Sequence, residues 1–284
     1  MDAKNEEFEH DKKDEQLREE IQKEMNGYTQ SIRDVHKNYI QPMLDGFSIG
    51  VENMQPFFEM AEHITGLMNI INWESISDAA AERIKEIDRL LQEYEQDFWC
   101  LDYEILDDIE EGITLEIVSV YVDKNLESYV EAIIKEPMYE LHVSLIKETY
   151  EAYKKGFYKL CAMSLFAAFE HVIASWRAGN IKAEMVSVKQ NPKVFKLYNK
   201  IKPEVYSDIE QVQFSKVFAL SVLRMFKRTF VKIPDELCQE LNRNSIAHGF
   251  HNYDSLNKTD ILKLFQLLKS TLVIKYLDIN EIEN

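Results

Sequence analysis

The spacing of apolar residues predicts that most of the chain is helical. From Leu17 to Tyr39 apolar side chains recur every three or four residues, which places them on one face of a helix. The same period predicts further helices over 54–71, 75–98, 139–155, 157–176, 207–229 and 258–276. Only 8 glycines and 6 prolines interrupt 284 residues, which favours helices over turn-rich β structure. We therefore predict an all-α protein.

Two segments allow more than one interpretation. The apolar stripe that begins at Leu17 covers about three heptads, so it either packs on its own domain or pairs with another chain as a coiled coil. Residues 113–122 are rich in β-branched side chains and can form a strand, although a helix through Ile134 fits the surrounding pattern better. We favour packing within the domain for the first segment and a helix for the second.

The segment from Phe157 to Trp176 is the most apolar of the predicted helices. It is apolar almost all round, Leu160 included, which is typical of a helix at the centre of a core. Glu170 and His171 are its polar exceptions. A charged residue on a buried helix needs a partner, so Glu170 either pairs with a basic residue such as Arg243 or lies at a solvent-facing edge.

Charge is distributed unevenly along the chain. The net charge is −17, but residues 1–139 contain 34 acidic and 12 basic residues, a net charge of −22, whereas residues 140–284 contain 16 and 21, a net charge of +5. Only the second half is suited to bind a polyanion. Because Pro137 is the best boundary in the sequence, we predict an acidic helical region over 1–137, with a sensing, regulatory or partner-binding role, and a second helical domain over 138–284.

Cysteine usage and the N-terminal sequence indicate a cytoplasmic protein. Cys100, Cys161 and Cys238 are scattered and show no paired metal-ligand spacing, which is typical of a reducing compartment. The first residues lack the basic and apolar regions of a secretory signal. No apolar run reaches 18 residues without charge, so we expect no membrane contact.

The richest chemistry lies between Leu241 and His251, in the sequence LNRNSIAHGFH. Arg243 supplies a permanent charge and a planar fork of donors, Asn244 a neutral donor and acceptor, and His248 a proton carrier near neutral pH. We predict that the helix carrying these candidate catalytic residues starts at Pro234 and Asp235.

Other residues of the second half are candidates for supporting roles. Three cations close the helix predicted over 207–229, and together with His251 they are candidate RNA-binding residues: Arg224, Lys227 and Arg228. Glu170 is a candidate to support Arg243. No metal or cofactor is expected, because the one possible ligand group, His248 and His251 with Asp254 nearby, lacks a defined set of three ligands.

This set of residues suits cleavage of RNA without a metal. The 2′-hydroxyl is a built-in nucleophile, histidine moves the protons, and arginine stabilises the negative charge that develops on the phosphate. Five positions turn a helix through about 140°, so Arg243 and His248 of one copy project in different directions. A second copy across a twofold axis would complete the site. We therefore expect a homodimer formed through the C-terminal half.

The run from Asn242 to Gly249 resembles the signature of the HEPN superfamily, the higher eukaryotes and prokaryotes nucleotide-binding domains. In that signature an arginine is followed by a polar residue, then by any three residues, and then by a histidine. The resemblance extends to an upstream apolar helix with the sequence FAAFE and to a closing amphipathic helix, and it covers about the last 145 residues. It implies an α-helical bundle, a composite dimer site with Arg243, Asn244 and His248, metal-independent RNA cleavage, and a role in toxin or abortive-infection defence against phage. Phe250 stands where some members carry tyrosine, so the chemistry of that tyrosine is not expected.

Two alternatives stay open at the level of sequence. A protein of this fold can bind a nucleotide or phosphate at Arg243 and His248 without cleaving it, as an interaction module in a defence or phage-related system. Alternatively both residues are structural, with Arg243 paired to a carboxylate and His248 at a helix end.

Overall fold

The computed structural model describes residues 73–105, 115–189, 192–206 and 214–277. Contacts divide the chain into two units, Met1–Trp73 and Glu74–Asn284, and all the described residues except Trp73 belong to the second. The helices predicted over 17–39 and 54–71 lie outside the described residues, as does the first part of the helix predicted over 207–229.

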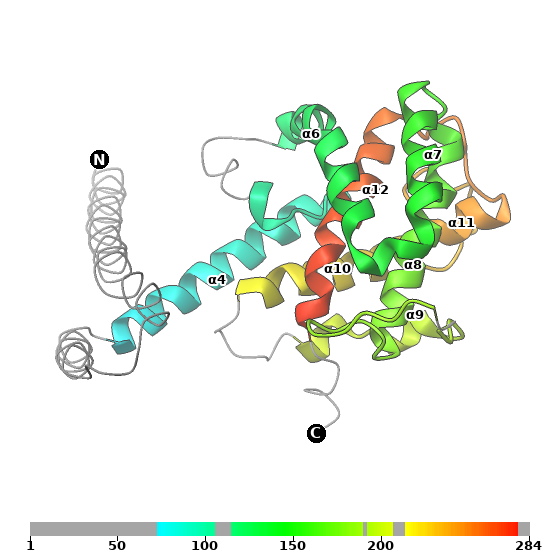
Figure 1. Cartoon of the computed structure of the whole chain (residues 1–284). Coiled ribbons are helices and arrows are strands. Elements are labelled where there is room, and N and C mark those ends of the chain that lie inside the picture. The colour runs from blue at the N-terminus through cyan, green and yellow to red at the C-terminus, as the bar shows by residue number, and fades with distance from the viewer. Residues whose placement is uncertain (1–72, 106–114, 190–191, 207–213, 278–284) are drawn as a thin grey trace, which may run out of the picture. The chain divides into compact units, whose positions relative to one another are not determined.

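The described residues form helices, turns and loops. In chain order the α-helices and the short 3-10 helices (η) are α4 (Trp73–Gln96), α6 (Leu115–Lys135), η2 (Pro137–His142), α7 (Val143–Lys154), α8 (Tyr158–Arg177), α9 (Leu197–Lys200), η3 (Pro203–Tyr206), α10 (Phe214–Thr229), α11 (Arg243–His248), α12 (Lys258–Ser270) and η4 (Thr271–Tyr276) (Figure 1). In these ranges extended pairing is limited to two isolated bridges, Ile181 with Val186 and Cys238 with His251. The prediction of an all-α protein is confirmed.

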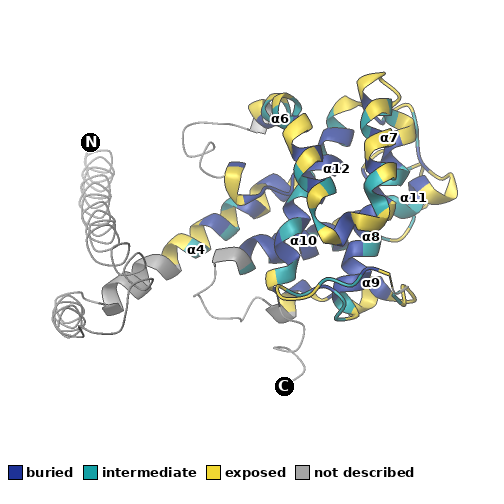
Figure 2. Ribbon diagram, in the orientation of Figure 1, coloured by how far each residue is buried: buried dark blue, intermediate teal, exposed yellow. Residues whose placement is uncertain are grey.

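Helix α12 lies at the centre of the packing. It contacts α6, α8 and α10, and α7 packs along α8. Figure 2 shows α12 and much of α8 as buried, with exposed residues concentrated on the outer sides of α4, α6 and α7. Two large aromatic side chains enter this core with their polar atoms paired: the Tyr139 hydroxyl donates to the carbonyl of Leu268, and the Trp176 indole N–H donates to the carbonyl of Leu277.

A buried ion pair fixes α4 against α10. The Arg224 guanidinium donates from Nε and Nη2 to both carboxylate oxygens of Glu95, at 2.8 Å and 2.7 Å, and Nη2 also lies 2.9 Å from Asp88 Oδ1. The Ser221 hydroxyl donates to Glu95 as well. Because Glu95 is buried, this paired geometry is what allows a carboxylate to lie between the two helices.

Pro137 is a turn inside the second unit. Helix α6 precedes Pro137 and packs against α12, which follows it by more than a hundred residues. Pro137 itself is the first residue of η2, a position where the missing backbone N–H costs no hydrogen bond. The contacts therefore place the start of this unit at Glu74, before the boundary expected at Pro137.

Several predicted elements differ in detail from those observed. The favoured helical interpretation is confirmed for residues 115–134 by α6. Helix α8 is not buried all round, because Leu160 is 70% exposed and Ala167 is also exposed on the same side. No helix starts at Pro234, since the chain runs without helix from Val231 to Asn242 and α11 begins only at Arg243.

Within the described ranges, no helix combines the length and the apolar character that a membrane span requires.

Candidate active site

The limits of α11 are set by the residues on either side of it. The Asn242 side chain accepts hydrogen bonds from the backbone N–H groups of Asn244 and Ser245, at 2.9 Å and 3.2 Å, which caps the helix and starts it at Arg243. Gly249 ends the helix in a left-handed conformation (φ 79°), and the N–H groups of Gly249 and Phe250 both donate to the carbonyl of Ser245. Arg243 and His248 are therefore the first and last residues of a six-residue helix.

Arg243 and His248 bound the solvent-facing side of α11. Ser245 and Ile246 are buried against the core, whereas Ala247 and His248 are exposed and Arg243 is half-buried. At 100° and 1.5 Å per residue, Arg243 and His248 are separated by about 140° around the axis and about 7.5 Å along it. Between them on the exposed side lies the small side chain of Ala247, which leaves this side open to a substrate.

The guanidinium of Arg243 is held from three directions. Nη2 lies 2.6 Å from Glu170 Oε2 on α8, Nη1 donates to Asn244 Oδ1 at 3.3 Å, and the group lies 5.8 Å above the centre of the Phe230 ring. Of the two alternatives for Glu170, the ion pair with Arg243 is the one formed. Since each terminal nitrogen carries two hydrogens, one N–H on each is not used by these two bonds and can donate to a ligand.

The Asn244 amide ties the chain after α10 to α11. Its Nδ2 donates to the carbonyls of Phe230 and Val231, at 3.0 Å and 2.9 Å, which uses both amide hydrogens and turns Oδ1 toward Arg243. From the sequence we expected Asn244 to hold a phosphate or to orient the imidazole of His248. In the structure its contacts are with the backbone and with Arg243.

The imidazole of His248 faces solvent. Among the described residues no side chain or carbonyl forms a hydrogen bond or ion pair with this ring. It is therefore open to a substrate or to another copy of the chain.

His251 lies in the interior. It is 3% exposed, and both ring nitrogens are buried without a hydrogen-bond partner among the described residues. Burial lowers the pKa of His251, although Asp260 acts in the opposite direction, so the neutral ring is favoured. The structure therefore places His251 away from the surface where RNA would bind. Asp254 pairs with Lys159, and His248, His251 and Asp254 form no group of metal ligands in the described part of the chain.

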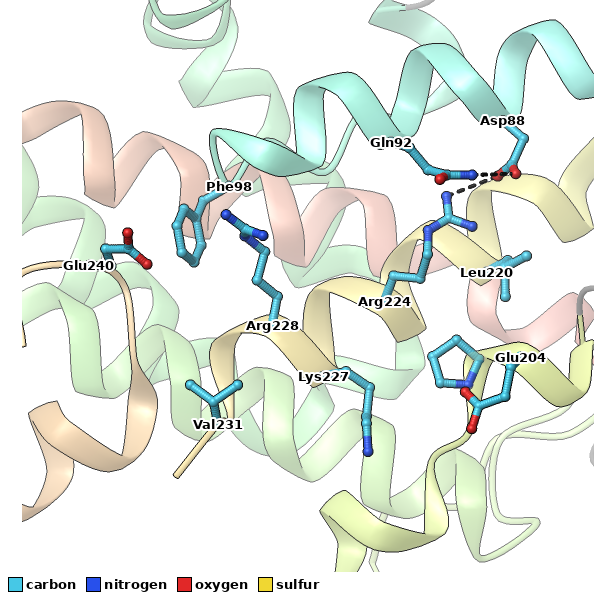
Figure 3. Close-up of a pocket in the computed structure, with 11 residues that line it drawn as sticks. Asp88, Gln92, Phe98, Glu204, Leu220, Arg224, Lys227, Arg228, Val231 and Glu240 are labelled. Atoms are coloured by element: carbon cyan, nitrogen blue, oxygen red, sulfur yellow. Dashed lines mark hydrogen bonds and ion pairs between the residues drawn. The ribbon is translucent and has the colours of Figure 1, made fainter. Parts of the chain in front are cut away.

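The three cations at the end of α10 line a pocket of about 780 Å³ between α4, α10 and the loop before α11 (Figure 3). Arg224 is bound by Glu95 and Asp88, and the guanidinium of Arg228 lies 4.5 Å above the ring of Phe98. Three carboxylates share the lining with the three cations: Asp88, Glu204 and Glu240. Because the charges balance, the pocket does not favour a polyanion.

Two features of the site were missed by sequence reasoning. One is the cap at Asn242, although asparagine before a helical run is a recognisable start signal. The other is the use of the Phe230 and Val231 carbonyls by Asn244, for which the sequence carries no signal because the contact joins segments 13 and 14 residues apart.

The chain matches no model of a known protein family, no curated protein and no solved structure.

Proposed function

We propose that the protein is a metal-independent endoribonuclease of the HEPN type whose active site is completed by a second copy of the chain. The observation that carries the proposal is the arrangement on α11, where a fixed Arg243 and an exposed His248 bound one open side of the helix. The resemblance of the sequence to the HEPN signature supports the same reaction.

The reaction follows from the chemistry of these two side chains. His248 of one copy removes the proton from a ribose 2′-hydroxyl, and the 2′-oxygen attacks the neighbouring phosphorus. As the bond from phosphorus to the 5′-oxygen breaks, His248 of the partner subunit protonates that oxygen. The products are a 2′,3′-cyclic phosphate and a 5′-hydroxyl. The remaining N–H groups of Arg243 donate to the non-bridging oxygens and stabilise their negative charge.

Asn244 and Glu170 act as positioning residues in this proposal. Glu170 fixes one terminal nitrogen of Arg243, and Asn244 Oδ1 fixes the other. A guanidinium held in this way loses little conformational freedom when it binds a phosphate. This assigns Asn244 to the orientation of Arg243 and not to proton transfer.

An exposed apolar surface next to α11 supports the homodimer. Leu160 and Ala167 lie two turns apart on the exposed side of α8, which packs against α11, and Phe250 follows α11 directly with 57% of its surface exposed. Apolar surface of this kind gains about 25 cal/mol for each Å² removed from water. A second copy that covers this surface through a twofold axis brings two α11 helices together.

The biological setting is proposed from the resemblance and from the charge distribution. HEPN ribonucleases are frequent in toxin–antitoxin and abortive-infection systems, where cleavage must be held in check. The residues before Pro137 are strongly acidic and those after it are mildly basic. Because α4 and α6 pack within the second unit, only the acidic residues that precede them are suited to restrain RNA binding until a trigger or protein partner binds. We place the enzyme in the bacterial or archaeal cytoplasm, in defence against phage.

A second candidate function is a non-catalytic module that binds a nucleotide or phosphate. The fixed N–H donors of Arg243 favour it, because they can hold a phosphate whether or not His248 transfers a proton. A ligand bound tightly to the purified protein, together with intact RNA under all conditions, would support this module.

A cleavage assay on purified full-length protein tests the proposal. Wild type is incubated with labelled single-stranded RNA and with DNA of the same sequence, with and without EDTA. We expect cleavage of RNA only, unchanged by EDTA, and a loss of about 10²- to 10⁴-fold in rate for His248→Ala and for Arg243→Ala. Lys85→Ala, an exposed cation on α4, is the matched control and should cleave like wild type. RNA left intact by wild type at every protein concentration would contradict the proposal.

A further inference from the structure

A strip of exposed lysine and aromatic side chains runs along the segment between α8 and α10. Phe195 is 75% exposed and Tyr198 is 37% exposed, and the lysines beside them are also exposed. From residue 192 to residue 204 there are four lysines and one glutamate, in a chain whose net charge is −17. We call this set the lysine–aromatic strip; it consists of Lys193, Phe195, Lys196, Tyr198, Lys200 and, from α10, Lys227.

The strip is mounted on anchored backbone. Leu197 and Ile201 are buried in the core, which fixes the short helix α9 between them. Lys227 Nζ donates to the carbonyl of Tyr198 at 2.9 Å and lies 3.6 Å from the centre of its ring. The aromatic side chains are therefore exposed, but the backbone that carries them is fixed to the core.

Cations accompany the rings of the strip in the structure. Lys196 Nζ lies 5.2 Å from the centre of the Phe195 ring, and Lys227 covers one face of Tyr198. Within the described residues no carboxylate forms an ion pair with Lys193, Lys196 or Lys200. These charges are consequently free to pair with an external anion.

Lysines interleaved with exposed aromatic rings are what a single-stranded nucleic acid requires. The phosphates of a single strand pair with the ammonium groups, and its bases stack on the ring faces. A duplex cannot stack on the rings in this way, because its bases are already stacked on one another. A single exposed aromatic residue would need no explanation. An acidic protein surface would use the lysines but would leave Phe195 without a partner.

The strip and the candidate active site meet at the C-terminal end of α10. Lys227 belongs to the strip, and Phe230, three residues further along, accepts the hydrogen bond from Asn244 and lies under the guanidinium of Arg243. Three residues of helix span about 4.5 Å. A strand bound on the strip can therefore continue over this end of α10 toward α11.

We propose that the lysine–aromatic strip binds single-stranded RNA and delivers it to α11. Bases stack on Phe195 and Tyr198, and phosphates pair with Lys193, Lys196 and Lys200. Binding by the strip does not depend on cleavage, but delivery to α11 rests on the proposed ribonuclease function.

Binding is measured with full-length His248→Ala protein, so that the RNA is not consumed. The probes are a fluorescent single-stranded RNA of about 12 nucleotides and a duplex of the same length. We expect tighter binding of the single strand and a Kd about five- to a hundredfold weaker for Phe195→Ala, with Phe195→Trp close to the parent. Lys193→Ala and Lys200→Ala should each lower the slope of log Kd against log salt by about 0.7.

Tyr276→Ala is the matched control. Tyr276 is 51% exposed, and Lys275 lies 5.5 Å from its ring centre, so it reproduces the pairing at Phe195 outside the strip. Thermal melting confirms that each variant is folded. Equal affinity for Phe195→Ala and Tyr276→Ala, equal affinity for single strand and duplex, or binding of an acidic peptide but not of RNA would overturn the inference.

The two proposals fail in distinguishable ways. If wild type cleaves RNA, and Phe195→Ala binds and cleaves RNA as well as the parent protein does, the proposal for the strip is wrong and the ribonuclease proposal stands. If RNA binding depends on Phe195 but wild type never cleaves RNA, the proposal for the strip stands and the ribonuclease proposal is wrong.

Discussion

The carboxylate of Glu170 lies 2.6 Å from the guanidinium of Arg243 and joins α8 to the first residue of α11. Both side chains are mostly buried, at 21% and 24% exposed, so water replaces this contact poorly. The pair therefore acts on two properties at once, because it stabilises the packing of α11 and it fixes the position of the charged group that we assign to catalysis.

Glu170→Ala is predicted to lower the free energy of unfolding by about 1–3 kcal/mol, because it leaves a partly buried guanidinium without its charged partner. Glu170→Gln keeps a hydrogen-bond acceptor for Nη2 and should cost less than the alanine variant. Urea unfolding measures both. The exposed pair of Lys135 with Glu131 is the control, and Glu131→Ala should change stability by less than about 0.5 kcal/mol. Equal effects at Glu170 and Glu131 would contradict a structural role of the buried pair.

Asn242→Ala is predicted to destabilise the protein by about 1 kcal/mol, because the N–H groups of Asn244 and Ser245 lose their cap. Asn242→Asp keeps the acceptor oxygen but loses the hydrogen bond that Nδ2 donates to the carbonyl of Lys232 at 3.4 Å, so it should be destabilised less than the alanine variant. Comparing the two by urea unfolding separates the cap from any general sensitivity of this position. Because the cap sets where α11 begins, the alanine variant should also cleave RNA more slowly, whereas the aspartate variant should not.

The length of α11 illustrates where sequence reasoning fails. Proline followed by an acidic residue, as at Pro234 and Asp235, is a common helix start, and it led to a predicted helix some nine residues too long at that end. The cap at Asn242 competes with that signal and prevails, because its side chain satisfies two N–H groups directly before Arg243. Local signals of similar strength are decided by tertiary contacts, here those of Asn244 with the chain after α10.

Burial was predicted well where the apolar period is strict and poorly where one side of a helix is left open. The pattern identified the core role of α8, because aliphatic and aromatic residues at helical spacing gain most from burial. The same reasoning assigned Leu160 to the core, but Leu160 is exposed. His251 was a candidate RNA-binding residue because of its chemistry, and it is buried. Polarity alone does not show which side of a mostly apolar helix lacks a neighbour.

The proposed dimer predicts that a charge placed on the exposed side of α8 separates the subunits. Leu160→Glu and Ala167→Glu should reduce the measured mass from twice 33.5 kDa to 33.5 kDa, by light scattering coupled to size-exclusion chromatography. At protein concentrations where wild type is dimeric, the cleavage rate of these variants should be at least about tenfold lower. A tenfold change corresponds to a loss of about 1.4 kcal/mol in the free energy of association. Val120→Glu introduces the same charge at a residue of α6 that is 65% exposed and should leave the mass and the rate unchanged. A wild type that is a monomer and still cleaves would show that the site is complete in one copy.

Stability is predicted to depend on pH through a pair of histidines between η2 and α8. The rings of His142 and His171 lie 4.9 Å apart in an edge-to-face arrangement, and His142 Nε2 is buried without a hydrogen-bond partner among the described residues. Burial lowers the pKa of His142 to about 4, and the nearby His171 acts in the same direction. Burial lowers the pKa of His171 as well.

The direction in which pH changes stability follows from the pKa of His142 in the folded and unfolded states. An unfolded histidine has a pKa of about 6.5, so between about pH 6.5 and pH 4 the unfolded chain binds a proton that folded His142 does not. Stability from this group is complete above about pH 6.5 and is lost as the pH falls to about 4, by about 2 kcal/mol after allowance for partial exposure. Asp102, whose pKa is raised by burial, acts in the opposite direction as the pH falls, so the test compares wild type with His142→Phe. Urea unfolding at about pH 7 and about pH 5 should show a smaller loss of stability for the variant, and an equal loss in both proteins would contradict the role of His142.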